Sequence, residues 1–322
     1  MPEPLKPFAI YHEHQDWFKP LFAELEKRGI PYVRLDAKQS FFDPASQRTD
    51  HDYSLIFNRM SPSAYLRGAG NSLFYTRDFL AHFERLGLRV INGVDAYTME
   101  ISKALQLDLL VSLGLPYPKA RVINHPAMVP AAAEGLRFPV VVKANIGGSG
   151  AGIVRYDSPE ALQAAVDAGS ISLGEGSTAL VQEYIPARDG HITRVETLGG
   201  KYLYGINVYT TGESFNLCPA DICQTNDGRA LTRSACALDA PKSGLRVEAY
   251  TPPAEVIEAI ERIVQAAKID VGGIEYMVDD RDGQLVYYDI NALSNFVADA
   301  RQVIGFDPHE RLVDFLVAQA GG

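Results

Sequence analysis

One segment constrains the fold of this chain more than any other: a strand that carries a lysine and runs directly into a glycine-rich loop. Three consecutive valines precede Lys143 and favour a buried strand, because β-branched side chains fit the pleated surface of a sheet. Gly147, Gly148, Gly150 and Gly152 follow closely and allow backbone N–H groups to approach an anion. The segment therefore predicts a clamp for a triphosphate.

The loop after Lys143 differs from the common phosphate-binding loops. No Gly-Lys-Ser/Thr sequence follows the glycines, which argues against a P-loop. Residues 153–156 resemble a second strand, whereas the loop of a dinucleotide fingerprint opens a helix. We therefore expect a flexible flap that joins two strands. A glycine-rich hairpin without a ligand is the alternative that this segment alone leaves open.

Charge and composition narrow the choice of partners. The 30 Lys and Arg residues against 40 Asp and Glu give a net charge of −10, which disfavours nucleic acid but allows a small anion held by local cations. No apolar run approaches the roughly 18 residues of a membrane span, and the first residues do not resemble a signal peptide, so we expect a cytoplasmic protein. Cys218, Cys223 and Cys236 show no CxxC spacing and indicate reduced thiols.

The order of strand-like and helical segments predicts three parts within the 322 residues. Residues 1–95 alternate the two kinds of segment, which predicts a small α/β domain with a mostly parallel sheet. Residues 96–186 hold the lysine strand and the flap, and we expect a central lid. Residues 187–322 contain two strand-like runs around an Asp- and Gly-rich turn, which predicts an antiparallel hairpin in a C-terminal domain.

The C-terminal hairpin carries a second group of candidate site residues. Because side chains alternate along a strand, Asp289 and Asn291 share one face, and Glu275 on the partner strand can meet them. Two carboxylates and an amide oxygen suit a hard cation such as Mg²⁺. A solvated hairpin face is the alternative. We expect the opposite, buried face to consist of Ile274, Tyr276, Val278, Val286, Tyr288 and Ile290.

Taken in order, these segments resemble the ATP-grasp superfamily, and within it the RimK-type glutamate ligases and related amino-acid ligases. Val90-Ile-Asn92 and Ile101-Ser-Lys103 are similar to the lead-in to the first ATP lysine, and 138–152 is similar to the second lysine with its loop. The resemblance covers about residues 90 to 300. It implies an ATP-grasp fold, α/β with a parallel-sheet N-terminal domain, a central α+β lid and an antiparallel-sheet metal-binding domain.

The resemblance also implies roles for individual residues. Lys143 and Arg194 would act at the reacting phosphate, and Glu275, Asp289 and Asn291 would hold Mg²⁺, with two ions expected and Mn²⁺ as a substitute. From alternation we expect Glu183, or backbone groups beside Tyr184, to read adenine, with Gln182 facing the other way. The residues expected to hold ATP are Lys103, Lys143, Gly147, Gly148, Ser149, Gly150, Gln182, Glu183, Tyr184, Ile185 and, at the ribose, Asp189, with His191 as the alternative ribose contact.

The activity implied by the resemblance is the ligation of a small-molecule carboxylate to an amine. The acid would attack the γ-phosphorus of ATP to form an acyl phosphate, and the amine would then displace phosphate to leave an amide or peptide bond. Arg59 follows a strand end and is the expected anchor for a substrate carboxylate, with a solvated loop arginine as the alternative.

Two other functions remain open at this point. One is an ATP-grasp kinase that phosphorylates a hydroxyl group, although polyanionic substrates of such kinases would need a basic cluster that this acidic chain lacks outside the ATP lysines. The other is a nucleotide-binding module without catalysis. Whether the chain forms a homo-oligomer is also left open.

Overall fold

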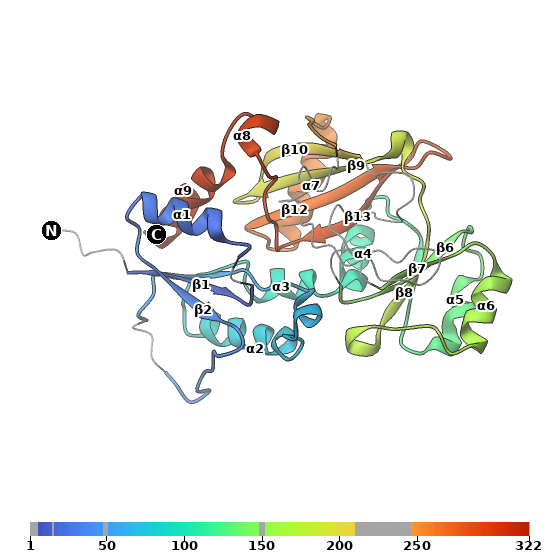
Figure 1. Cartoon of the computed structure of the whole chain (residues 1–322), viewed down its shortest axis with the longest axis horizontal. Helices are drawn as coiled ribbons and strands as arrows, with labels where there is room; N and C mark the ends of the chain where they lie inside the picture. The colour runs from blue at the N-terminus through green and yellow to red at the C-terminus, as the bar shows by residue number, and fades with distance from the viewer. Residues whose placement is uncertain (1–5, 15, 48–50, 148–151, 210–245, 322) are drawn as a thin grey trace.

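The computed structural model describes residues 6–14, 16–47, 51–147, 152–209 and 246–321. These residues form three sheets, each drawn from one stretch of the chain (Figure 1). The predicted flap residues Gly148, Ser149 and Gly150 lie outside the described residues, as do the three cysteines, Cys218, Cys223 and Cys236. No helix of the described part is long and apolar enough to cross a membrane.

The N-terminal part is a four-stranded parallel sheet in the order β2-β1-β3-β4, as the sequence predicts. Alternation along β1 places Phe8 and Ile10 in the core under α1, and Ala9 and Tyr11 in the core beside α2. The elements are β1 (Phe8–His12), α1 (Lys19–Lys27), β2 (Tyr32–Asp36), β3 (Leu55–Asn58), η1 (Ala64–Arg67), α2 (Asn71–Arg85), β4 (Val90–Ile91) and α3 (Val94–Glu100).

The central part is a four-stranded antiparallel sheet in the order β5-β8-β6-β7. Strands β6 and β7 pair with each other on the two sides of the flap, so the loop joins two strands as predicted. One face of this sheet packs on α5 and α6. The elements are α4 (Lys103–Ser112), β5 (Ala120–Ile123), η2 (Pro126–Met128), α5 (Val129–Ala133), β6 (Val140–Ala144), β7 (Ile153–Tyr156), α6 (Pro159–Asp167), η3 (Glu175–Ser177) and β8 (Ala179–Glu183).

The C-terminal part is a five-stranded antiparallel sheet in the order β11-β10-β9-β12-β13. Helix α7 covers one of its faces with Ile260, Ile263 and Val264, which pack on Val195, Ile274 and Ile290 of the strands. The elements are η4 (Arg188–Gly190), β9 (His191–Leu198), β10 (Lys201–Tyr209), β11 (Val247–Ala249), α7 (Ala254–Ala266), β12 (Val271–Val278), β13 (Leu285–Asn291), α8 (Ala300–Val303) and α9 (Pro308–Ala320).

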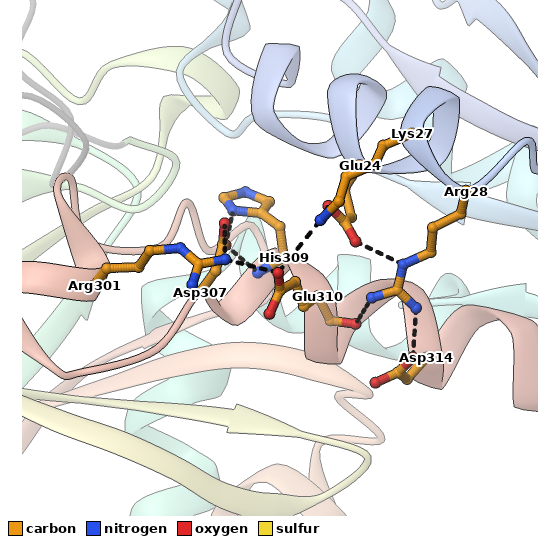
Figure 2. Close-up of polar contacts among 8 residues, drawn as sticks. All are labelled: Glu24, Lys27, Arg28, Arg301, Asp307, His309, Glu310 and Asp314. Atoms are coloured by element: carbon orange, nitrogen blue, oxygen red, sulfur yellow. Dashed lines mark hydrogen bonds and ion pairs between the residues drawn. The ribbon is translucent and has the colours of Figure 1, made fainter.

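Helix α9, at the end of the chain, lies beside α1 of the N-terminal part (Figure 1). Ion pairs join the two helices, as Figure 2 shows: Arg28 lies 2.5 Å from Asp314, and Lys27 lies 3.4 Å from Glu310. Glu310 also accepts from Arg301 at 2.7 Å. Below these pairs, Leu312, Val313 and Leu316 join the same core as Phe22 and Leu25. The first and last helices therefore tie the N-terminal sheet to the C-terminal part.

Asn92 connects the N-terminal sheet to the hairpin strands. It has a positive φ of 52°, which asparagine tolerates better than most residues. Its amide nitrogen donates to the carbonyls of Val271 and Ala292, both at 2.6 Å, and its amide oxygen accepts from the backbone of Asp270 and Val271. The asparagine therefore fixes the open end of the β12–β13 hairpin, where β12 begins and β13 ends, against the N-terminal domain.

Candidate active site

Three charged side chains form one row across three neighbouring strands. In the sheet register Glu275 on β12 lies between Arg194 on β9 and Asp289 on β13. The next row is made by Glu196, Gly273 and Asn291 in the same way. The structure thus brings together Arg194, Glu275, Asp289 and Asn291, which the sequence places far apart.

Arg194 is held at the centre of this group by several acceptors. It donates to Glu275 at 2.7 Å, to Glu196 at 2.6 Å and to the hydroxyl of Ser294 at 3.0 Å. A Cβ on Gly273 would lie 2.7 Å from a guanidinium nitrogen of Arg194. The absence of a side chain at Gly273 therefore gives the guanidinium its place above the strand.

A β-bulge changes one prediction for the hairpin. Glu275 pairs with Asp289 but Tyr276 pairs with Tyr287, so Tyr288 is an additional residue on its strand. Its hydroxyl donates to Glu275 at 2.7 Å, and Val286 shares a core with Met277 rather than with Ile274. The prediction that Val286 and Tyr288 lie on the face opposite Glu275 is therefore wrong, because strict alternation does not continue through a bulge.

Two lysines approach the row from the central part of the chain. Lys103 lies in the first turn of α4, which Ser102 caps by accepting from the backbone of Leu105. Asn145, at the end of the Lys143 strand, accepts from Ala104 at 2.8 Å. This contact ties the helix that carries Lys103 to the strand that carries Lys143. The Lys103 ammonium then lies 2.6 Å from Asp289.

Burial and neighbouring charges shift the pKa values of these groups. Burial, reinforced by Lys103, lowers the pKa of Lys143 to about 7. Burial alone would raise the pKa of Asp289, but Lys103, with Lys143 and Arg194, holds it below its ordinary value. Burial raises the pKa of Glu275, although Arg194 opposes this effect. The site therefore balances its carboxylates with cations of the protein itself.

Two buried carboxylates at the site were not predicted. Glu196 is fully buried and bonds both Arg194 and the hydroxyl of Ser294. Glu100, at the end of α3, accepts from the backbone of Ala292 and Leu293, just beyond β13. Burial raises the pKa of Glu100 to about 7. The Arg-x-Glu spacing on β9 could have indicated Glu196, because residues two apart share a face, whereas no local signal marks Glu100.

The side chains expected near adenine have a different arrangement from the predicted one. Val141 pairs with Gln182 and Lys143 pairs with Leu180, so Gln182 shares the face of Lys143. The Gln182 side-chain oxygen is buried and has no hydrogen-bond partner among the described residues. Glu183 lies on the other face and accepts from the backbone of Arg137 at 3.0 Å. This geometry contradicts the expected orientation of both side chains, because alternation separates two faces without telling which one meets the site.

The remaining predicted residues lie around this region. Tyr184 is stacked under the guanidinium of Arg155, Ile185 is buried, and Asp189 is exposed in a turn with a φ of 56°. Gly147 is the last described residue before the flap.

Arg59 is buried rather than solvated: it donates to the carbonyl of Ser294 at 2.5 Å and to the side chain of Asn295 at 3.0 Å. Since Arg194 bonds the hydroxyl of that same serine, Arg59 lies next to the row.

The donor set fits a hard divalent cation. Glu275 and Asp289 are cross-strand neighbours, and Asn291 lies one row further along the same strand. All three provide oxygen atoms, which Mg²⁺ prefers. Among the described residues, no three His, Cys, Asp or Glu side chains gather as ligands, so the predicted set depends on the amide of Asn291 and on oxygens from elsewhere. Lys103 and Arg194 already pair with these two carboxylates, so a metal ion would have to compete with both cations.

Comparison with known proteins places these features in a family context. Residues 101–215 match the RimK-like ATP-grasp domain. The probable alpha-L-glutamate ligase of Shewanella halifaxensis is 28% identical over 223 residues, which cover 67% of this chain and 45% of that protein. The D-alanine–D-alanine ligase of Geobacter sulfurreducens is 27% identical over 137 residues, which cover 40% of this chain and 42% of that protein. The chain thus spans about half the length of the curated relatives that it matches.

Solved structures extend the comparison to almost the whole chain. The ATP-grasp ligase PsnB, complexed with a minimal precursor, has a TM-score of 0.65 at 17% identity and covers 98% of this chain, which in turn covers all of that chain. D-cycloserine synthetase DcsG has a TM-score of 0.67 at 18% identity, with 97% and 99% covered. The fold is therefore the ATP-grasp fold. Within it, residues 101–215 form a RimK-like ATP-grasp domain, as the sequence resemblance predicts.

Proposed function

We propose that this protein is an ATP-dependent carboxylate–amine ligase that activates a carboxylate as an acyl phosphate and releases ADP and phosphate. The observation that carries the proposal is the buried row of Arg194, Glu275 and Asp289, with Lys103 bonded to its end. Phosphoryl transfer requires cations placed around a group whose charge is spread over several oxygens. A row of paired charges on the C-terminal sheet, approached by Lys103 and Lys143 of the central part, offers such an environment.

Binding of ATP is assigned to the lysines, the flap and the end of β8. Lys103 and Lys143 would neutralise phosphate charge, together with backbone N–H groups of the flap at Gly147, Gly148, Ser149 and Gly150. The free side-chain oxygen of Gln182 can accept from the exocyclic amine of adenine. Backbone groups of Tyr184 and Ile185 would border the base and Asp189 the ribose, whereas the Glu183 side chain holds the Arg137 loop instead.

Glu275, Asp289 and Asn291 would hold Mg²⁺, with two ions proposed and Mn²⁺ able to substitute. When bound, the metal would supply charge compensation for the phosphate oxygens. Around it, Arg194 is rigidly oriented by Glu196 and Ser294 and would stabilise the charge that develops on the transferred group. No side chain of the protein needs to act as a nucleophile in this scheme.

The substrates are proposed as a small carboxylate and an amine, of the amino-acid or peptide-like class. The names of the relatives support this class, since the matched proteins are called glutamate and D-alanine ligases. Arg59 is the proposed carboxylate anchor, because Ser294 joins it to Arg194 and because it follows a strand at the carboxyl edge of the parallel sheet.

A matrix of carboxylates and amines, assayed for phosphate release with product mass spectrometry, tests the proposal. We expect one combination to yield ADP, phosphate and an amide in equal amounts, and Asp289→Asn to abolish this turnover. Formation of AMP would contradict acyl-phosphate activation. A phosphorylated alcohol as product would instead support the kinase, and nucleotide binding without turnover across the matrix would support a non-catalytic module.

A further inference from the structure

Protein cations pair with both carboxylates of the proposed metal set. The Lys103 ammonium lies 2.6 Å from an oxygen of Asp289, and Arg194 lies 2.7 Å from an oxygen of Glu275. The second oxygen of Glu275 accepts from Tyr288 at 2.7 Å. An ammonium or guanidinium at this distance occupies a lone pair of the carboxylate oxygen, and its positive charge opposes the approach of a metal ion.

The two ion pairs differ in how firmly they are fixed. Arg194 also bonds Glu196 and Ser294, its side chain is 7% exposed, and its rigid fork cannot leave without stranding Glu196. Lys103 is a flexible side chain on the first turn of α4, and it is 15% exposed. The Lys103–Asp289 pair is therefore the one of the two that can open more easily.

Within the proposed function, two partners compete for the Lys103 ammonium: the Asp289 carboxylate and a phosphate of the nucleotide. While Lys103 neutralises Asp289, its ammonium is not directed at a phosphate, and Asp289 attracts a divalent cation less strongly. We infer that Lys103 is a placeholder cation, which occupies Asp289 in the ligand-free protein and turns to the nucleotide when a divalent cation takes its place. This inference rests on the function proposed above and adds a role for Lys103 that precedes any nucleotide.

The test is the binding of Mn²⁺ to the nucleotide-free protein, measured by electron paramagnetic resonance. We expect Lys103→Met to bind Mn²⁺ at least about tenfold more tightly than the wild type, because removal of an adjacent positive charge unmasks the carboxylate. Lys268→Met is the matched control, since Lys268 forms a 2.6 Å pair with Asp95 at the surface. This control should leave Mn²⁺ affinity unchanged.

A second variant identifies the site of the additional binding. In the double variant Lys103→Met/Asp289→Asn the gain in Mn²⁺ affinity should disappear. Lys103→Gln offers a second neutral side chain, and circular dichroism melting identifies any variant that is unfolded. Unchanged Mn²⁺ affinity in both folded neutral variants, or a gain that survives Asp289→Asn, would overturn the inference.

The same samples separate this inference from the proposed function. If the wild type fails to bind a non-hydrolysable ATP analogue in the presence of Mg²⁺, the proposed function fails whatever the Mn²⁺ result is. If the analogue binds and Mn²⁺ affinity does not respond to Lys103, only the placeholder role is lost.

Discussion

Two of the ion-pair networks in the described part of the chain differ in burial. Between α1 and α9, Arg28 is 28% exposed and its partner Asp314 is 58% exposed (Figure 2). Lys27 and Glu310 are 62% and 35% exposed. Around Arg194, the side chains of Glu196 and Glu275 are at most 1% exposed. Similar residue types and similar distances therefore occur in two very different dielectric surroundings.

This difference separates a structural role from a functional one. Exposed pairs contribute about 0–1 kcal/mol each, so the α1–α9 network adds little beyond the apolar contacts beneath it. A buried pair contributes no more than apolar residues of the same volume would, because its desolvation offsets its attraction. Stability alone therefore does not account for the five charged residues of the network around Arg194, whereas the proposed binding of a charged ligand would. These five are Lys103, Arg194, Glu196, Glu275 and Asp289.

The largest expected effect is the removal of the central cation. Arg194→Met should lower the free energy of unfolding by about 3–5 kcal/mol, because it leaves Glu196 and Glu275 buried without a partner. Arg28→Met at the α1–α9 contact should cost only about 1 kcal/mol, because Asp314 is exposed and Lys27 still pairs with the buried Glu24. Urea denaturation measures the loss of unfolding free energy in each variant. Equal losses would show that burial does not distinguish the two networks.

The next effect concerns pH. Because the pKa of Glu100 is raised to about 7 in the folded state, its favourable contribution is present in acid and is lost as pH rises from about 4.5 through 7. At one pKa unit per 1.4 kcal/mol, the loss amounts to roughly 3 kcal/mol. Glu100→Gln keeps the acceptor for Ala292 and Leu293 and should be more stable than the wild type at pH 8 but not at pH 4. A constant difference between the two proteins from pH 4 to pH 8 would contradict this account.

Nucleotide binding should also move a proton. Burial keeps the pKa of Lys143 at about 7, and a triphosphate placed beside its ammonium would raise that pKa. We expect uptake of up to about one proton per nucleotide at pH 8, seen in titration calorimetry as a binding enthalpy that depends on the buffer. Lys143→Arg stays charged and should abolish the dependence. The same buffer dependence in this variant would assign the proton to another group.

The smallest effect is that of salt. At 1 M NaCl the Debye length is about 3 Å, so the cost of Arg28→Met, about 1 kcal/mol at low salt, should vanish. The cost of Arg194→Met should persist, since its partners are buried. Denaturation at the two salt concentrations tests this, and a salt-sensitive Arg194 effect would mean that water enters the network around Arg194.

Sequence patterns predicted the parts of this architecture that depend on local order. The valines before Lys143, the glycines after it and the alternation in the β12–β13 hairpin are local signals, and the structure has the corresponding strands. The orientation of Gln182 and Glu183 was wrong because it depends on pairing with β6. The place of Tyr288 depends on a bulge, and Glu100 becomes part of the site only through contacts with residues about two hundred positions away.

Asp289→Asn tests most directly whether the ion pairs around Arg194 form the proposed site for nucleotide and metal. This change keeps the shape of the side chain and removes one charge, with Asp95→Asn, the surface partner of Lys268, as its control. Calorimetric titration with a non-hydrolysable ATP analogue and Mg²⁺ should show affinity reduced by at least about a hundredfold in Asp289→Asn, a loss of roughly 3 kcal/mol, while thermal melting still shows a cooperatively folded protein. Wild-type affinity in this folded variant would contradict the proposed site.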